Sequence, residues 1–513
     1  MMAVLVALPF CLLAVASAQQ AGSQKQEEHV PVSFATCTKA GGCKGTQTTL
    51  TMDAQWRWLH DSRPNQFQNC LQGTAWDKTI APDGLKAASN CALEGMTSSD
   101  YATTYGVTPI KGGVSLNFVN GQSVGSRMYM MEEGKQDKYM MFKLLNKEFR
   151  FDVDVSTLEC GLNGAVYFVE MKADGGLGEG NNTAGAKYGT GYCDAQCPHD
   201  LKFIHGEGNV KDWHTTKAGP VGAYGNCCSE LDIWEANAYA TAFTTHACDT
   251  TGPLKCTTDE KCGETAPECK CCDLEDCPCC KRYSGVCDKD GCDFNSYRMG
   301  DEMFFGKGAG YTVDSTKPIS VVTQFITTDG TDTGDLKEMR RLYVQDGKVI
   351  QNSKISPDAI ANLPAGASAD SLTDATCQAG KKAFDNPDDF TKKGGMAGMG
   401  KAMKRGMVLV LSLWDDMLTK MDWLDSETPS KIHPKNFPGT KRGPCSMQAG
   451  DPNTLRSQSP NSKVHYTNIM VGEIDSTYGP NVGAELLDVV ATPAPKPAPT
   501  LPPWQQQQQQ QQQ

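Results

Sequence analysis

Long apolar segments and clusters of basic side chains are both missing from most of this sequence. After residue 18, no stretch approaches the roughly 18 consecutive apolar residues of a membrane-spanning helix, so we expect no membrane contact. The net charge is −12, and no Lys- or Arg-rich block occurs. Because phosphate binding requires clustered cations, a nucleic-acid partner is disfavoured. We therefore expect a soluble globular protein without an internal repeat.

Helical periodicity is also scarce, whereas strand-like segments recur between glycine-rich turns. The best candidate helix, Pro387–Arg405, is interrupted by glycines. In Glu148–Val155, apolar and charged residues alternate with the period of a half-buried strand. Asp346-Gly347 separates two more such runs, which predicts a hairpin. Further strands are expected at 164–171, 319–327 and 407–414. This pattern predicts an all-β sandwich with long functional loops.

The first residues and the cysteines both indicate export. An apolar run in residues 4–15 is followed by Ala16-Ser17-Ala18, which is typical of a signal peptide and its cleavage site. The sequence has 23 cysteines, and Cys11 lies in this segment, which leaves 22. An even number in an oxidising compartment predicts a disulfide framework. We expect a secreted, extracellular protein with residues 1–18 removed.

Composition divides the remaining chain into a domain and a tail. Residues 19–490 are predicted to form one domain, with a cysteine-rich insertion at about 256–280. Residues 491–513 are Pro-rich and end in nine glutamines, so we expect an extended or disordered tail. Nothing follows this tail, and no separate binding module is expected.

Three acidic residues lie close together in Cys227–Asn237. On a regular strand, Glu230 and Asp232 point to one face and Glu235 to the other. A single β-bulge between Asp232 and Glu235 would return Glu235 to the first face and leave Leu231 and Ile233 in the core. Bulges are enriched beside active sites because they redirect side chains in this way. A helix would scatter the three acids, since residues five apart differ by about 140°.

Converging carboxylates fit one kind of chemistry well. They repel one another, which raises the pKa of at least one member. Retaining glycoside hydrolysis needs an ionised nucleophile and a protonated acid, roughly 5–5.5 Å apart. We assign Glu230 as the nucleophile, Glu235 as the general acid/base, and Asp232 as the group that orients and tunes Glu230. Three surface acids on a solvated strand are the alternative interpretation.

The same segment resembles the active-site strand of glycoside hydrolase family 7, the fungal-type cellulases. The similar residues are CCSELDIWEAN at 227–237 and His246-Ala247-Cys248. Similar blocks follow in order at 54–60, 146–156, 160–171, 183–198, 291–300, 407–416 and 458–469, so the likeness spans about Cys37 to Gly472. It implies a concanavalin-like β-sandwich (jelly roll) of two curved antiparallel sheets, with long loops roofing a substrate tunnel. It also implies the retaining roles assigned above, on cellulose or another β-1,4-glucan.

The resemblance also supplies candidate sugar-binding residues. A glucan cleft needs flat aromatic rings and polar groups. Trp56 and Trp58 would lie toward the entrance, and their spacing of two places both rings on one face. Trp414 and Trp423 would lie nearer the scissile bond. Further candidates, for each of which a structural role is the alternative, are Tyr167, Asp194, Gln196, His246, Arg298 and Arg442, with Asn163 and Arg127 as weaker ones.

Loop length bears on the mode of action. The segments 209–227 and 351–406 are long, as in tunnel-forming members of the resembled family, whereas its endoglucanases shorten both. This favours a processive cellobiohydrolase that releases mainly cellobiose from chain ends, with reducing ends preferred. An endo-β-1,4-glucanase and a non-catalytic glucan-binding lectin are the alternatives. We expect a monomer without a cofactor or metal.

By the same resemblance, seven disulfides should join cysteines outside the insertion: Cys37–Cys43, Cys70–Cys91, Cys160–Cys445, Cys193–Cys228, Cys197–Cys227, Cys248–Cys287 and Cys292–Cys377. The eight cysteines at 256–280 could then pair among themselves, which accounts for all 22. A metal-thiolate cluster is the alternative for this insertion, but disulfides are favoured in an exported protein.

Overall fold

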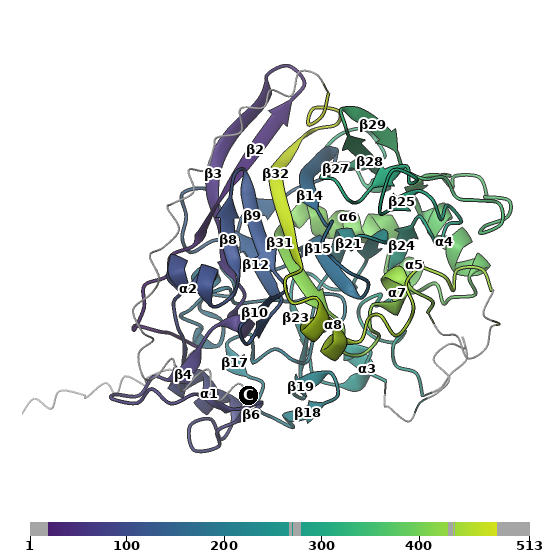
Figure 1. The fold of residues 1–513 in the computed structure, drawn as a ribbon. Helices are drawn as coiled ribbons and strands as arrows, with labels where there is room; N and C mark the ends of the chain where they lie inside the picture. The colour runs from purple at the N-terminus through teal and green to yellow at the C-terminus, as the bar shows by residue number, and fades with distance from the viewer. Residues whose placement is uncertain (1–18, 266–268, 270–278, 429–433, 435–436, 480–513) are drawn as a thin grey trace, which may run out of the picture.

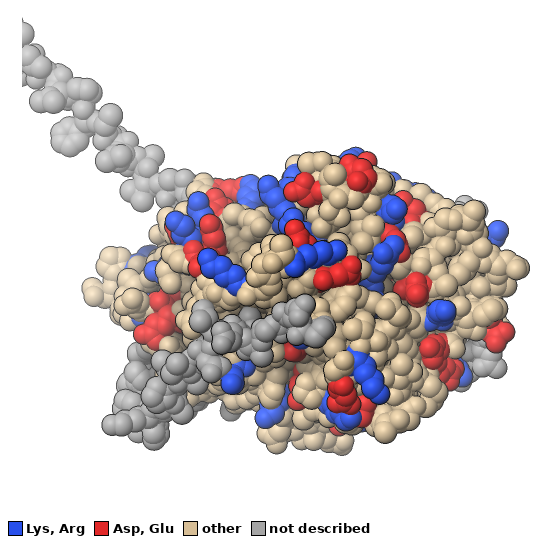
Figure 2. Space-filling view, turned by 90° about the horizontal axis from the view of Figure 1, so that it is seen from above, with Lys and Arg blue, Asp and Glu red and all other residues tan. Residues whose placement is uncertain are grey.

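A computed structural model describes residues 19–265, 269, 279–428, 434 and 437–479. The predicted signal peptide at 1–18, the predicted tail at 491–513 and most of the centre of the cysteine-rich insertion lie outside these residues. Among the described helices, none combines the length and apolar character needed to cross a membrane. Figure 2 shows one face of the molecule, on which acidic and basic side chains are interspersed.

Two layers of antiparallel strands form the body of the protein (Figure 1). The order of pairing in the first layer is β9 (Gly113–Asn117), β32 (Lys463–Glu473), β14 (Lys147–Asp154), β27 (Ile319–Thr327) and β28 (Leu336–Gln345). The order in the second is β3 (Gly42–Met52), β12 (Ser126–Met130), β31 (Met407–Asp415), β15 (Leu162–Val169), β21 (Glu230–Ala236), β22 (Thr241–His246) and β24 (Cys292–Asn295). The predicted all-β sandwich is confirmed.

The main core lies between the two layers. The predicted alternation in β14 is confirmed, since Phe149, Phe151 and Val153 are buried in the core. The ring of Phe149 meets that of Phe168 on β15 edge to face, with centroids 5.0 Å apart. The alternate residues of the second layer therefore point away from the core, and they form the face on which the acidic residues lie.

The predicted hairpin at Asp346-Gly347 is also confirmed. β28 pairs with β29 (Lys348–Gln351), and Gln345 lies opposite Lys348. Asp346 and Gly347 have φ angles of 51° and 74°. Two consecutive positive φ angles are typical of a type I′ turn, which matches the twist of the strands it connects.

Short helices are grouped in the segment before β31. The predicted helix at 387–405 is present in two parts, α5 (Asp389–Lys392) and α6 (Gly395–Arg405), separated where Gly394 and Gly395 adopt positive φ. The sequence analysis missed α4 (Asp374–Ala383), which Thr373 caps at its N-terminus. Its buried positions include Thr376, Gly380 and Lys381, so it has no apolar stripe to recognise.

All seven disulfides implied by the family resemblance are present. Two more, Cys256–Cys262 and Cys269–Cys279, lie within the insertion. Cys280 is also disulfide-bonded. At these five cysteines the disulfide prediction is confirmed. Cys271, Cys272 and Cys277 lie outside the described residues.

Candidate active site

A β-bulge in β21 gathers the three acidic residues on one face. Asp232 lies opposite Thr244 on β22, and Glu235 lies opposite Ala242, so three steps on β21 match two on its neighbour. On the other side, β15 shows the same shift between Val166 and Tyr167. The bulge predicted between Asp232 and Glu235 is therefore confirmed. The intervening apolar residues are fully buried in the main core: Leu231, Ile233 and Trp234.

Each carboxyl of the acidic cluster, Glu230, Asp232 and Glu235, is buried and has a partner. The backbone N–H of Ala195 donates to Oε2 of Glu230 at 3.0 Å. The side-chain amide of Asn163 donates to Oε1 of Glu235 at 3.0 Å. The three side chains are 9%, 5% and 8% exposed, respectively. The carboxyls are thus largely shielded from water.

His246 lies beside the acidic cluster, and a backbone carbonyl on the far side of its ring fixes its orientation. Its Nε2 lies 3.1 Å from Oδ2 of Asp232, and its Nδ1 lies 2.9 Å from the carbonyl oxygen of Asp288. Since a carbonyl oxygen only accepts hydrogen bonds, Nδ1 carries a proton. Gly291 leaves the space for this ring, because a Cβ atom there would lie 2.6 Å from the imidazole.

Burial and mutual repulsion change the acidity of all three carboxyls. Burial raises the pKa of Glu230 well above its usual range, and repulsion from Asp232 and Asp194 adds to this. Burial and then repulsion from Glu235 raise the pKa of Asp232 in the same way. A hydrogen bond joins Glu230 to Asp232, so the two carboxyls can share one proton and titrate as a pair.

Glu235 has a different environment. Burial raises its pKa to about 7, although the hydrogen bond from Asn163 and the charge of His246 both lower it. A carboxyl with this pKa keeps its proton in weakly acidic solution, as a general acid must. The site thus places a proton donor and a proton-sharing carboxyl pair on one strand face.

Two further predicted residues lie next to the cluster. The carboxyl of Asp194 is close enough to raise the pKa of Glu230, and burial raises its own pKa. The hydroxyl of Tyr167, which lies opposite Asp232 across the ladder, is 3.0 Å from that of Tyr192. Gln196 is turned toward another partner, since its Nε2 donates to the carbonyl oxygen of Lys289 at 2.8 Å.

Arg298 and Arg442 converge on Asp293, a residue that the sequence analysis did not single out. Arg442 lies 3.2 Å from Oδ2 of Asp293, and Arg298 binds the other carboxylate oxygen. Burial and the neighbouring Arg442 lower the pKa of Arg298 to about 9. Asp293 also raises the pKa of Glu235. Alternation within Cys292–Asn295, whose Cys292 and Phe294 lie in the core, is the signal that could have identified it.

Trp414 and Trp423 form a pair near this arginine cluster. Their ring centroids are 6.3 Å apart, with the planes inclined by 31°. Trp414 lies opposite Asn163 in the ladder, on the same face as the acidic cluster. Both rings are partly buried against a small cluster that includes Ala242, the residue opposite Glu235.

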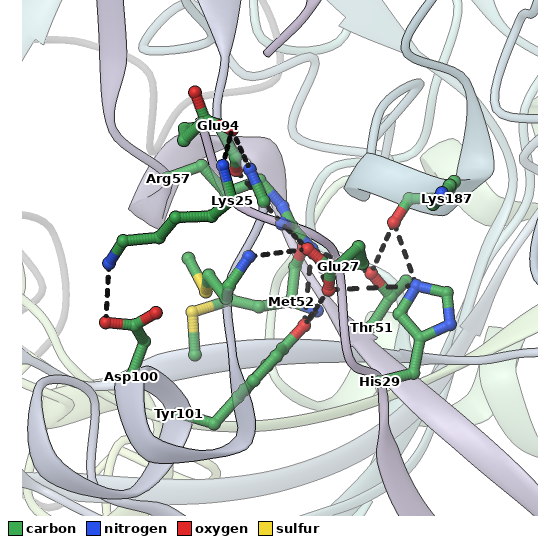
Figure 3. Close-up of polar contacts among 12 residues, drawn as sticks. Lys25, Glu27, His29, Thr51, Met52, Arg57, Glu94, Asp100, Tyr101 and Lys187 are labelled. Carbon is green, nitrogen blue, oxygen red and sulfur yellow. Dashed lines mark hydrogen bonds and ion pairs between the residues drawn. The ribbon is translucent and has the colours of Figure 1, made fainter. Parts of the chain in front are cut away.

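Trp56 and Trp58 lie elsewhere, and their setting differs from the expected strand. Trp56 ends a short 3₁₀ helix, η1 (Ala54–Trp56), and its indole N–H donates to the carbonyl oxygen of Val124. The indole N–H of Trp58 donates to Asn69 at 2.7 Å. Arg57 between them is not a polar cleft residue. It is buried and bound to Glu27, Thr51 and Tyr101 (Figure 3).

Arg127 connects Trp56 to the centre of the site. Its guanidinium lies 3.3 Å from the ring centroid of Tyr192 and 5.6 Å from that of Trp56. Asp53 accepts a hydrogen bond from Nε of Arg127 at 2.9 Å. Arg127 and Asn163, which the sequence analysis ranked below the other candidates, are thus both in contact with the site. In the sequence, the only indication for Arg127 and Asn163 was that each lies in a predicted strand close to stronger candidates.

The donor atoms of Glu230, Asp232 and His246 lie within 4.8 Å of one another, which is the spacing of a metal site. The three other such groups among the described residues consist largely of cysteines that are paired in disulfides, and these sulfurs are not available as thiolates. A proton shared between Glu230 and Asp232 would relieve the repulsion between their carboxyls.

Comparison with known proteins agrees with this geometry. A family model described as glycosyl hydrolase family 7 matches residues 21–478. A cellobiohydrolase from Daphnia pulex is 44% identical with a TM-score of 0.82, over 89% of this chain and 100% of that chain. One from Melanocarpus albomyces, complexed with cellotetraose, is 38% identical with a TM-score of 0.79, over 90% and 99%. An endocellulase from Humicola insolens is 33% identical with a TM-score of 0.72, over 90% and 100%. The chain belongs to glycosyl hydrolase family 7.

Proposed function

We propose that this protein is a secreted cellulase that hydrolyses β-1,4-glucosidic bonds with retention of configuration, and that it acts as a processive cellobiohydrolase. The observation that carries the hydrolase proposal is the bulge in β21. It brings Glu230, Asp232 and Glu235 to one face at the cost of repulsion among buried carboxyls. A protein that only bound glucan would gain nothing from this arrangement, which argues against a lectin.

The three acids take separate roles in the proposed reaction. Glu235 donates its proton to the glycosidic oxygen while Glu230 attacks the anomeric carbon, which forms a covalent glycosyl-enzyme and releases the leaving chain. Glu235 then takes a proton from water, which attacks the same carbon and frees Glu230. The N–H of Ala195 favours the ionised form of Glu230. Asp232 then holds the proton that the pair shares.

Sugar binding is proposed for the aromatic and polar side chains around this strand. Trp414 and Trp423 would stack on the sugar rings near the scissile bond, and Trp56 and Trp58 on rings toward the entrance. The other proposed contacts are Tyr167, Asp194, Gln196, His246, Arg298 and Arg442.

The processive mode has two kinds of support. The segments 209–227 and 351–406 are long, and Arg298 donates to Asn386 of the second segment at 2.7 Å. The two cellobiohydrolases above are also more similar to this chain than the endocellulase is, at 44% and 38% against 33% identity. A roofed site keeps its sugar contacts after each cut, so the chain slides instead of leaving.

Product analysis tests the catalytic proposal. We expect the wild type to release mainly cellobiose from crystalline cellulose, with the β-anomer appearing first by proton NMR. Glu230→Gln and Glu235→Gln should each lower the rate by orders of magnitude, because the covalent and the proton-transfer steps fail separately. Glu132→Gln, on an exposed side chain, is the matched control. Full activity of Glu230→Gln would overturn the assignment.

Viscometry separates the two modes of action. On a soluble cellulose derivative, a chain-end enzyme releases cellobiose with little loss of viscosity, whereas rapid loss of viscosity would identify an endo-β-1,4-glucanase. Amino-terminal sequencing of the exported protein tests removal of residues 1–18. Size-exclusion chromatography tests whether it is a monomer.

A further inference from the structure

A buried arginine reaches from the first layer of the sandwich to the bulge in the second. Arg341 lies on β28 between Met339 and Tyr343, whose side chains both point into the main core. It is only 2% exposed. Its guanidinium donates a hydrogen bond to the carbonyl oxygen of Ile233 on β21. The two residues are 108 positions apart in the sequence, and the main core lies between their strands.

The acceptor is the extra residue of the bulge. Ile233 is the one position of β21 that the register omits on the β15 side, where Asp232 and Trp234 are opposite consecutive residues. On the β22 side, Ile233 and Trp234 fall within the interval that carries the register shift. Buried backbone carbonyls need a hydrogen-bond donor. Arg341 provides the donor for the carbonyl of Ile233, which the neighbouring strands do not provide at the bulge.

The position of Arg341 is unfavourable for stability alone. No carboxylate among the described residues forms an ion pair with it. Tyr343 on the same strand is its side-chain partner, and Nε and Nη1 have no other hydrogen-bond partner there. The guanidinium instead lies 4.4 Å from the ring centroid of Phe243 on β22. Burying a cation costs free energy that an apolar side chain at the same position would avoid. Core packing alone therefore does not account for an arginine at this position.

We propose that Arg341 is a positioning residue that holds the bulge in β21 and thereby directs Glu235 toward the scissile bond. This inference rests on the proposed function, since it assumes that Glu235 is the general acid. Without the hydrogen bond from Arg341, the backbone at Ile233 would rearrange so that its carbonyl oxygen accepts a hydrogen bond from another donor. Glu235 lies two residues further on, and its carboxyl would then shift relative to the bond it protonates.

Leaving-group dependence separates this role from a structural one. A misplaced general acid slows substrates with a basic leaving group, such as cellotriose, but not 2,4-dinitrophenyl β-cellobioside, whose leaving group needs no proton. We expect Arg341→Met to lower kcat/KM for cellotriose by about tenfold to a hundredfold and for the dinitrophenyl substrate by less than about threefold. Glu235→Gln should show the same contrast more strongly.

Controls make each outcome decisive. Arg340→Met changes the preceding residue on β28, whose side chain pairs with Glu338 at the surface. This variant should leave kcat/KM for both substrates unchanged. Equal loss on both substrates would overturn the proposal. If Arg341→Met does not fold, Arg341→Lys is measured instead, and failure of both to fold would assign Arg341 to stability and also overturn it. If Glu235→Gln shows no contrast, the proposed function fails instead.

Discussion

Nε2 of His246 lies 3.1 Å from Oδ2 of Asp232, while Nδ1 of the same ring contacts the carbonyl oxygen of Asp288 at 2.9 Å. The second contact fixes a proton on Nδ1, so Nε2 faces the acidic cluster. Both residues lie on adjacent strands of the second layer, where Glu230 is directly opposite His246. The imidazole is thus placed to influence the ionisation of the whole cluster.

Removal of His246 should change the acidic side of the pH–rate profile. Burial raises the pKa of Glu230, and the charge of His246 opposes this. In His246→Ala the pKa of Glu230 therefore rises further. Since the nucleophile must be ionised, the acidic limb of kcat/KM should move to higher pH. Assays on an aryl β-cellobioside across pH would measure this shift. His214→Ala, at an exposed histidine, should leave the limb in place, and an unmoved limb in His246→Ala would contradict the argument.

Asn163 controls the other side of the profile. Its amide donates to Glu235 and lowers the pKa of that carboxyl, which burial raises to about 7. Asn163→Ala removes the lowering effect, so Glu235 should keep its proton at higher pH. The basic limb of kcat/KM should then move upward, together with a lower maximum because the carboxyl is less well oriented. Asn453→Ala, at an exposed position on α8 (Pro452–Gln458), is the control. A basic limb that moved downward would contradict the prediction.

The features of the site that were predicted are those that depend on neighbouring residues. The bulge could be predicted from two local requirements. The apolar side chains of Leu231 and Ile233 must be buried in the core, and the three nearby acids must lie on one face to act in the same reaction. The family resemblance also indicated that the three acids lie together on one face of the strand. Disulfide pairs such as Cys160–Cys445, separated by 285 positions, could be predicted only from that resemblance, because spacing alone does not determine pairing.

The features that were missed depend on contacts between distant segments. Alternation within Cys292–Asn295 places Asp293 on the face away from the core, but only the folded structure shows that Arg298 and Arg442 converge on it. Arg341 was seen only as part of a hairpin, where a charged residue normally points to solvent. Its burial depends on Ile233 in the opposite layer. Arg57, between Trp56 and Trp58 in the sequence, is buried because it binds Glu27, which lies 30 positions away.

Trp423 should contribute to binding more than to the chemical step. Its ring pairs with Trp414 and is partly exposed on the short helix α7 (Asp422–Asp425), which follows β31. Loss of one aromatic stacking contact costs about 1 kcal/mol, or roughly fivefold in affinity. We expect Trp423→Ala to raise KM for soluble cello-oligosaccharides by about this factor with a smaller change in kcat. Leu418 lies in the turn between β31 and α7 and is 70% exposed, so Leu418→Ala should change neither KM nor kcat. A large fall in kcat alone would contradict a binding role.

The buried pair of Arg57 and Glu27 should stabilise the fold in a pH-dependent manner. Arg57 binds both carboxylate oxygens of Glu27, and Tyr101 and the N–H of Met96 donate to the same group (Figure 3). Burial alone would raise the pKa of Glu27, but Arg57, the charge of His29 and the hydrogen bond from Tyr101 lower it overall. Stability from this group is therefore present above its unfolded pKa of about 4.3 and is lost as the pH falls through the lower folded pKa.

Breaking one half of this pair should cost more than removing both. Glu27→Gln leaves a buried, uncompensated guanidinium, for which we expect a loss of about 3–5 kcal/mol in the free energy of unfolding. Arg57→Met leaves a buried carboxylate, which can take up a proton, so its loss should shrink at acidic pH. The double variant buries neither charge and should lose less than the sum of the two single variants. Denaturant unfolding at pH 7 and pH 4 measures all three values. Additive losses that do not change with pH would show that packing, rather than the ion pair, stabilises this region.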